Sequence, residues 1–364
     1  MSFSFSTINS RRPAAIRTPV AFLVTFLVFL LTCGLADQAM AAPATLGARG
    51  DISQVKRLPA TVESIAAAIA AEAAGEAGTA NPPKTPQRAI PAELSRITAH
   101  SAIIMDDGSG RILFAKAPDA PRQPASTIKV LTGIIALKSL TGDESVPVSR
   151  EAASRPSSKM YLDPAKVYRA DELISGVLLG SANDASVALA EMLAGSEQQF
   201  AEYMTMQARH WGANNTICKT ATGLTAKDQA STARDLALIF REAMRNPDFA
   251  KRMKTRSMTT DEGNTLYNHN KALWRIPGAE GGKTGYTLAA RQTYVGKFSQ
   301  GEATFIVAIM GSETMWKDLK QLVGYGFSQY PAGVSATEAT SSPGNLVAAT
   351  GSTEDIGSAA TSHN

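Results

Sequence analysis

The chain has 364 residues, of which 44% are hydrophobic, and this is enough apolar material for one large domain or two small ones. Its formal charge is +4, but three arginines and one aspartate in residues 1–41 leave only +2 for the rest. The other basic residues are scattered and form no stripe interleaved with aromatic residues. Composition therefore excludes a nucleic-acid-binding protein.

Residues 1–41 have the pattern of an export signal. A basic segment ends at Arg17, a mostly apolar run begins at Ala21, and the small-x-small tripeptide Ala39-Met40-Ala41 follows. The apolar run is short for a membrane span of about 20 residues, so we expect cleavage rather than an uncleaved anchor. A twin-arginine signal at Arg11-Arg12 and a lipoprotein signal at Cys33 are alternatives that the neighbouring residues fit less well.

Composition divides the remainder into three parts. Residues 42–97 are rich in Ala and Pro and are expected to form a spacer, whereas the folded body is expected over 98–330. Residues 331–364 are rich in Ser, Thr, Ala and Gly, contain no Lys or Arg, and predict a disordered tail. Once Cys33 leaves with the signal, Cys218 has no disulfide partner and is predicted to be a buried structural thiol.

Predicted strands lie near both ends of the body, with helices between them. Two short apolar runs, Ala102 to Met105 and Ile112 to Ala115, flank a Gly- and Asp-rich turn and predict a β-hairpin. Helices are then expected over Ser126 to Leu140, Ala170 to Leu193 with a break near Gly180-Ser181, and Thr232 to Met244. Strands at Lys283 to Thr287, Gln292 to Phe298 and Ala303 to Met310 precede a closing helix over Thr314 to Phe327. This order predicts an α+β domain whose terminal strands share one sheet.

The start of the first predicted helix pairs a hydroxyl with an amine. Ser126 and Lys129 are three residues apart and therefore share a helix face. A serine hydroxyl needs a base to become a nucleophile, and a lysine can serve if burial or a nearby cation lowers its pKa. A helix N-terminus also leaves the backbone N–H of Ser126 free to face an oxyanion. The alternative is an N-capping serine beside a surface lysine.

Two further motifs place polar groups where elements begin. Ser181 and Asn183 lie at the break in the helical pattern, where they either face a cleft or cap the following helix. Lys283-Thr284-Gly285 opens a strand. The charge of Lys283 and the hydroxyl of Thr284 could hold a substrate carboxylate, and Gly285 would let another backbone segment approach closely. A nucleotide-binding P-loop is discounted because the residues after Gly285 predict a strand rather than a helix.

Together the three motifs resemble those of the D-alanyl-D-alanine carboxypeptidase family of low-molecular-weight penicillin-binding proteins. Ser-x-x-Lys, Ser-x-Asn and Lys-Thr-Gly occur in the required order over residues 98–330. Further matching stretches are Ser158-Lys159-Met160-Tyr161-Leu162, Ser181-Ala182-Asn183-Asp184-Ala185, Ser231-Thr232-Ala233-Arg234-Asp235-Leu236 and Asn268-His269-Asn270.

The resemblance implies a fold, an activity and roles for single residues. The fold would be a five-stranded antiparallel sheet beside a helical cluster, as in penicillin-binding proteins and β-lactamases. The exported enzyme would act in the periplasm or cell-wall compartment on peptidoglycan stem peptides, and β-lactam antibiotics would acylate it. The implied roles are these: Ser126 as nucleophile, Lys129 as base, Ser181 as a catalytic hydroxyl, Asn183, Lys283, Thr284 and Gly285 as substrate-binding residues, and the backbone N–H groups of Ser126 and Tyr286 as the oxyanion hole. No metal or other cofactor is implied.

Departures from the family pattern keep alternatives open. Residues after about 330 show neither the second β-rich domain nor the C-terminal amphipathic membrane anchor of many relatives. No Arg follows the last strand, where relatives often use one to hold the substrate carboxylate. Removal of the terminal D-alanine is the leading hypothesis, and cleavage of D-alanyl cross-links is the closest alternative. A β-lactamase is disfavoured because no Glu-x-x-Leu-Asn stretch follows Asn183, and a non-catalytic wall-binding protein is disfavoured by the intact motifs.

Overall fold

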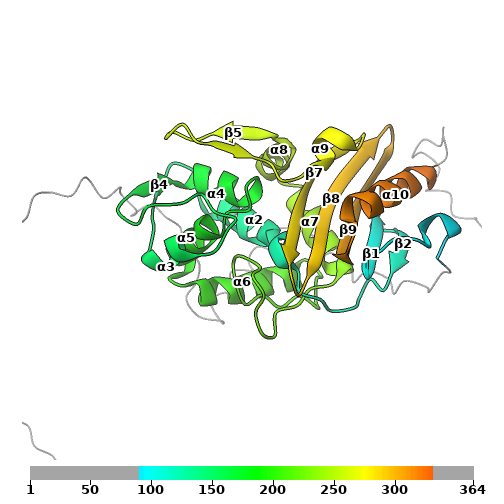
Figure 1. The fold of residues 1–364 in the computed structure, drawn as a ribbon, viewed down its shortest axis with the longest axis horizontal. Coiled ribbons are helices and arrows are strands. Elements are labelled where there is room, and N and C mark those ends of the chain that lie inside the picture. Colours follow the sequence, from blue (N-terminus) through cyan, green and yellow to red (C-terminus); the bar gives the residue numbers. More distant parts are fainter. Residues whose placement is uncertain (1–89, 331–364) are drawn as a thin grey trace, which may run out of the picture. The chain divides into compact units, whose positions relative to one another are not determined.

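A five-stranded antiparallel sheet lies beside a cluster of helices in the computed structural model, which describes residues 90–330 (Figure 1). The predicted signal, most of the predicted spacer and the predicted tail lie outside the described residues. The strand order is β2-β1-β9-β8-β7. The strands are β1 (Ser101–Asp106), β2 (Ile112–Lys116), β7 (Ala279–Thr287), β8 (Arg291–Gln300) and β9 (Ala303–Ser312). Because β1 pairs with β9, the terminal strands of the body share one sheet, as the sequence predicts.

The sheet is buried on both faces, and alternate residues of its strands enter two separate cores. In β9, Phe305, Val307 and Ile309 pack with helix α10 (Met315–Ser328) on one face. Ile306, Ala308 and Met310 point to the opposite face and pack with the helical cluster. Because side chains of a strand alternate between faces, a strand covered on both sides is apolar at nearly every position. This explains the uninterrupted apolar run of β9.

The helical cluster occupies most of the chain between the two groups of sheet strands. Its helices are α2 (Lys129–Ser139), α3 (Arg150–Ser154), α4 (Ala170–Leu178), α5 (Asn183–Ala194), α6 (Glu197–His210), α7 (Ala233–Ala243), α8 (Pro247–Lys254) and α9 (Ala272–Arg275). Two small hairpins accompany them, β3 (Ser145–Pro147) with β4 (Val167–Arg169), and β5 (Ser257–Thr259) with β6 (Thr265–Tyr267). Helix α2 is buried along most of its length, in agreement with its apolar sequence.

Capping and backbone conformation set several helix boundaries. The Thr232 side chain accepts a hydrogen bond from the backbone N–H of Asp235 at 3.0 Å and so begins α7 where the sequence predicts. The predicted helix over Ala170 to Leu193 is split into α4 and α5, and Ser181 between them has a positive φ of 61°. A non-glycine residue in this conformation cannot continue a right-handed helix, so the break is sharp.

Two boundaries differ from the sequence-based expectation. Ser126 lies in a 3₁₀ turn, η2 (Ala125–Ile128), and the α-helix begins only at Lys129. A second 3₁₀ turn, η1 (Ala92–Leu94), falls within the last residues of the predicted spacer, and Leu94 and Ile97 are buried in the core beside α10. The packed body therefore begins several residues before 98. Within residues 90–330, no helix combines the length and the apolar character that crossing a membrane requires.

Candidate active site

The 3₁₀ turn Ala125–Ile128, called the Ser126 turn below, lies between the helical cluster and the sheet and is hydrogen-bonded at its start. The Thr127 hydroxyl donates to the Pro124 carbonyl at 2.6 Å, and the Thr293 hydroxyl of β8 donates to the same carbonyl at 3.0 Å. Ala125 is fully buried with a positive φ of 50°. These contacts hold the half-buried Ser126 beside strand β7.

Lys129 is fully buried below Ser126, and its amine has three neighbours. Nζ lies 3.0 Å from Ser126 Oγ, 2.7 Å from Asn183 Oδ1 and 2.5 Å from the Thr222 carbonyl oxygen. The latter two oxygens can only accept hydrogen bonds. A neutral amine has two hydrogens and one lone pair, so these two acceptors use both hydrogens. The lone pair is then left for the hydroxyl of Ser126.

The surroundings of Lys129 favour the neutral amine. Burial lowers the pKa of Lys129 well below its ordinary value, and the charge of Lys283 lowers it further. The carboxylates of Glu197 and Asp184 act in the opposite direction. The Ser-x-x-Lys spacing thus places the amine beside the serine hydroxyl, and the role of Lys129 as proton acceptor stays a prediction.

Ser181 and Asn183 point toward the two lysines instead of capping α5. The N-cap of α5 is Ala182, and it makes no side-chain capping bond. Asn183 Oδ1 accepts from Lys129, whereas its Nδ2 donates to the Pro156 carbonyl at 2.8 Å, and this second bond fixes the orientation of the amide. Ser181 Oγ accepts a hydrogen bond from Lys283 Nζ at 2.9 Å. The capping alternative is therefore wrong.

Strand β7 forms the opposite wall of the cleft. Lys283 is buried beneath the cleft surface, where desolvation lowers its pKa to about 7. Thr284, Gly285 and Tyr286 line the cleft, and Tyr286 is exposed at its rim. A Cβ atom at Gly285 would lie only 2.8 Å from the backbone nitrogen of Ser126, so glycine is required for this approach.

The cleft has a volume of about 450 Å³ and brings together every predicted site residue except the two lysines, which lie below its surface. Its lining also contains residues outside the three motifs: Ser157, Ser158, Gly223, Leu224, His269, Lys271, Thr287, Gln292, Met315 and Trp316. His269 belongs to the Asn-His-Asn stretch noted in the sequence. Met315 and Trp316 follow strand β9, where the family resemblance led us to look for an Arg, and the backbone N–H of Met315 donates to Gln292 Oε1 at 2.8 Å.

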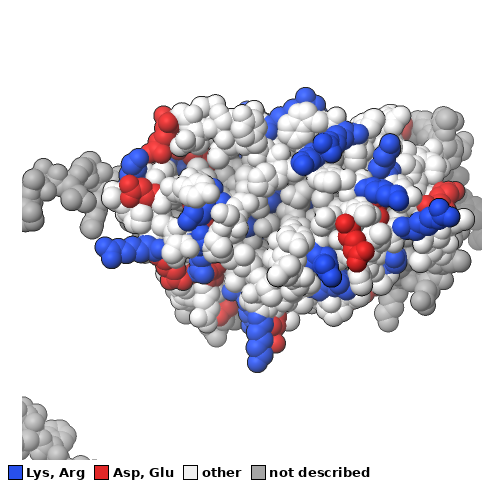
Figure 2. All heavy atoms as spheres, viewed as in Figure 1, with Lys and Arg blue, Asp and Glu red and all other residues white. Residues whose placement is uncertain are grey.

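Lysines gather at the cleft: Lys271 lines it, and Lys129 and Lys283 lie beneath it. Desolvation, followed by the charges of Lys283 and Lys129, lowers the pKa of His269 to about 4. Elsewhere, on the face in Figure 2, basic and acidic residues are interspersed. Among residues 90–330, no group of three or more His, Cys, Asp or Glu side chains is arranged to hold a metal ion.

A second hollow, of about 720 Å³, lies away from the serine. It is lined by four glutamates, Glu151, Glu191, Glu197 and Glu202, together with Lys219 and Cys218. Burial raises the pKa of the Cys218 thiol to about 12, so this residue is the buried, unreactive thiol that the sequence predicts. The one serine in its lining, Ser196, caps α6 by accepting a hydrogen bond from the backbone N–H of Gln199 at 3.2 Å. A serine hydroxyl beside a buried amine is found in the cleft at Ser126.

A serine hydroxyl above a buried lysine, at the junction of a five-stranded sheet and a helical cluster, is the arrangement expected of a penicillin-binding protein. The family model for D-alanyl-D-alanine carboxypeptidases matches residues 85–314. The chain belongs to this family, and the fold and family expected from the sequence are confirmed.

Individual relatives agree with this assignment. The chain is 37% identical over 244 residues to the D-alanyl-D-alanine carboxypeptidase DacB2 of Mycobacterium tuberculosis, a match that covers 64% of this chain and 84% of DacB2. A crystal structure of a D-alanyl-D-alanine carboxypeptidase from M. tuberculosis H37Rv has a TM-score of 0.64 and 34% identity, covering 69% of this chain and 98% of that one. The ampicillin-bound penicillin-binding protein D2 of Listeria monocytogenes has a TM-score of 0.59 and 26% identity, with 64% and 99% covered. Several other curated relatives are longer, and the chain spans about 60% of their length.

Proposed function

We propose that this protein is a serine-type D-alanyl-D-alanine carboxypeptidase, which removes the terminal D-alanine from peptidoglycan pentapeptide stems through an acyl-enzyme. The observation that carries the proposal is the amine of Lys129, whose two obligatory acceptors leave its lone pair for Ser126. Family membership supports the same reaction, because the curated relatives bear the name of this activity.

Acylation begins with Ser126. Its Oγ attacks the carbonyl carbon of the penultimate D-alanine while its proton passes to Nζ of Lys129. The negative charge that develops on the carbonyl oxygen is stabilised by the backbone N–H groups of Ser126 and Tyr286. Gly285 allows strand β7 to lie close enough to the Ser126 turn for both groups to face one oxygen.

Breakage of the C–N bond requires a proton for the leaving amine. Ser181 donates its hydroxyl proton, and the ammonium of Lys283, at 2.9 Å, replaces that proton. In deacylation the order is reversed: a water attacks the ester and its proton passes through Ser181 to Lys283, while Lys129 returns its proton to the departing Ser126 oxygen. All groups regain their starting protonation, and the net reaction consumes one water.

The substrate is held by its terminal carboxylate and its backbone. The hydroxyl of Thr284 and the positive charges of Lys283 and Lys271 suit a carboxylate at the β7 side of the cleft. The remaining amide hydrogen of Asn183 is available to a peptide carbonyl on the other wall.

β-Lactam antibiotics resemble the D-alanyl-D-alanine end and are proposed to acylate the same serine. After ring opening, the leaving nitrogen stays tethered beside Ser181, where the deacylating water would otherwise enter. We therefore expect a persistent adduct. One structural relative, the Listeria protein, was solved in an ampicillin-bound form.

The proposed reaction takes place outside the cytoplasm, because its substrate is peptidoglycan. Export is proposed on the basis of residues 1–41, with cleavage after Ala41. N-terminal sequencing of protein recovered from the periplasm should begin at Ala42. A product that retains Met1, or one that starts at a lipidated Cys33, would refute this form of export.

One experiment tests the activity directly. The mature protein is incubated separately with a pentapeptide muropeptide and with a cross-linked dimer, and the products are analysed by mass spectrometry. Loss of one alanine from the pentapeptide, absent in Ser126→Ala, supports the carboxypeptidase. Cleavage of the dimer with an intact pentapeptide would replace it with the endopeptidase alternative, and no product from either substrate would refute both.

A further inference from the structure

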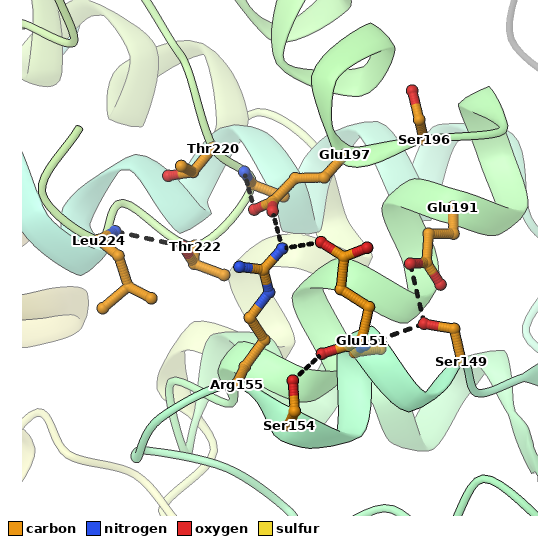
Figure 3. A network of polar contacts seen from close by, with 12 residues as sticks. Ser149, Glu151, Ser154, Arg155, Glu191, Ser196, Glu197, Thr220, Thr222 and Leu224 are labelled. Carbon is orange, nitrogen blue, oxygen red and sulfur yellow. Dashed lines mark hydrogen bonds and ion pairs between the residues drawn. The ribbon is translucent and has the colours of Figure 1, made fainter. Parts of the chain in front are cut away.

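A glutamate outside the cleft is connected to the base through one loop. Glu197 is the first residue of α6, and its side chain is only 13% exposed. Glu197 lines the second hollow described above and not the cleft, so it does not contact a substrate bound in the cleft. Figure 3 shows the carboxylate of Glu197 between the side chain of Arg155 and the loop of residues 220–224.

The two oxygens of Glu197 have different partners. Oε1 accepts a hydrogen bond from the backbone N–H of Ala221 at 2.9 Å. Oε2 lies 2.7 Å from Nη2 of Arg155, which also contacts Glu151 Oε1 at 2.7 Å. A buried carboxylate with a guanidinium on one side and a backbone N–H on the other has a fixed orientation.

The loop that Glu197 holds delivers a carbonyl to Lys129. The Ala221 carbonyl accepts from the Thr132 hydroxyl of α2 at 2.7 Å, and the next carbonyl, that of Thr222, accepts from Lys129 Nζ at 2.5 Å. Gly223 follows with a positive φ of 74°, and a Cβ at this position would lie 2.0 Å from the Ala125 carbonyl oxygen. The loop is therefore packed directly against the Ser126 turn.

The Thr222 carbonyl has a defined task in the neutral amine. Together with Asn183 Oδ1 it takes the two hydrogens of Nζ, and this leaves the lone pair for Ser126. If the carbonyl moves, one hydrogen is released and the lone pair is no longer directed at the hydroxyl. A residue that fixes the position of the Thr222 carbonyl therefore also fixes the orientation of the Lys129 amine.

We propose that Glu197, anchored by Arg155, is a positioning residue that holds the Ala221–Thr222 segment and thereby orients the Lys129 amine toward Ser126. This inference rests on the proposed function, because it assigns Lys129 as the base. It adds a residue that lies outside all three motifs. Glu197 touches neither substrate nor the reacting atoms, so its effect is exerted through the loop.

The negative charge of Glu197 also raises the pKa of Lys129 and so affects the pH above which its amine is neutral. The charged and titratable groups around Lys129 are Lys283 of β7, Asp184 of α5, Glu197 of α6 and His269 of the loop before α9. Lys283 lowers the pKa of Lys129, whereas Glu197 and Asp184 raise it. Acylation requires the neutral amine, so its rate rises with pH through the pKa of Lys129. Removal of the Glu197 charge should move this rise to lower pH.

Three variants separate position from charge. Glu197→Gln keeps an oxygen for the Ala221 N–H but loses the charge, whereas Glu197→Ala loses both. Glu202→Gln is the matched control, because Glu202 lies on the same helix and lines the same hollow but is exposed. The rate constant of acylation by a fluorescent penicillin is measured by stopped flow across pH, and folding is checked by circular dichroism and thermal melting.

We expect Glu197→Ala to acylate on the order of 10²-fold more slowly, as for a misplacement of about 1 Å at a reacting group. We expect Glu197→Gln to keep most of the rate at neutral pH with its acidic limb shifted to lower pH, and Glu202→Gln to match the wild type in both. An unshifted limb in Glu197→Gln, or a wild-type rate in folded Glu197→Ala, would overturn the inference. If Glu197→Ala does not fold, the limb of Glu197→Gln decides alone. Failure of the wild type itself to acylate would instead refute the proposed function.

Discussion

A single added methyl group at Gly285 should disable acylation while the fold persists. Gly285 of β7 is opposite Thr293 of β8 and next to the Ser126 turn. An alanine Cβ there would lie 2.5 Å from Thr293 Oγ1, 2.8 Å from the Ser126 backbone nitrogen and 3.0 Å from Ala125 Cβ. Ordinary van der Waals contacts lie at 3.4–4 Å. The strand and the turn must therefore separate by roughly 0.6 Å at Ser126, as for other overpacked sites.

The size of the effect follows from which groups move apart. The Ser126 and Tyr286 N–H groups, proposed to share the oxyanion, lie on the two segments that the methyl separates. Loss of one oxyanion donor costs about 10²–10³ in rate, or about 2.7–4 kcal/mol. Overpacking costs about 1–3 kcal/mol of folding free energy, which a domain with a stability of about 5–15 kcal/mol tolerates.

The assay compares Gly285→Ala with Gly324→Ala, a glycine of α10 that has no atom within 4 Å of the added Cβ. Stopped-flow acylation by fluorescent penicillin should fall by about 10²-fold in the first variant and stay unchanged in the second. Urea unfolding of both reports the cost in stability. A folded Gly285→Ala protein that acylates at the wild-type rate would refute the role of this close approach.

Three further outcomes are expected. Lys129→Ala should lose acylation by about 10²–10⁴-fold, and the Ser126→Ala/Lys129→Ala double variant should be little worse than either single one; multiplicative losses would show that the two do not act as a unit. Lys283 has a folded pKa of about 7 against an ordinary value of 10.5, so the unfolded state binds more protons between these values and stability should rise with pH across this window. The same rise in Lys283→Met, measured by chemical denaturation, would contradict this. The imidazole of His269, exposed on one side to screening solvent, should titrate by NMR between its lowered pKa of about 4 and the ordinary 6.5, and a midpoint above 6.5 would contradict the cationic field of the cleft.

The sequence predicted those site residues whose proximity follows from the local geometry of a helix or a strand. Ser126 and Lys129 are adjacent on one helical turn, so their contact depends only on local geometry. The break before Asn183 and the strand at Lys283 were also visible, because hydrophobic periodicity changes there. The strand at Ala303 to Met310 was predicted as well, whereas its burial on both faces became visible only in the structure.

The rest depended on contacts between distant segments. The carbonyl of Thr222 is a backbone group, so the identity of the residue gives no indication that it faces Lys129, which lies 93 positions earlier. Glu197 follows a capping serine and has the sequence appearance of an ordinary first-turn acid. The 3₁₀ geometry at Ser126 likewise depends on Thr293 and Gly285, which are supplied by strands far along the chain.

The pairing of β1 with β9 has a consequence for when the enzyme can first work. The N-terminal hairpin has β9 as its neighbour in the sheet, and Ser101 lies opposite Met310, about the full length of the body away. The cleft at Ser126 is likewise incomplete until β7 forms its opposite wall. Contacts of such sequence separation form late, because the entropy of closing a long loop must be overcome first. A chain that is still being synthesised therefore lacks the strands that complete the cleft, and we expect Ser126 and Lys129 to become active only after β7, β8 and β9 have joined the sheet.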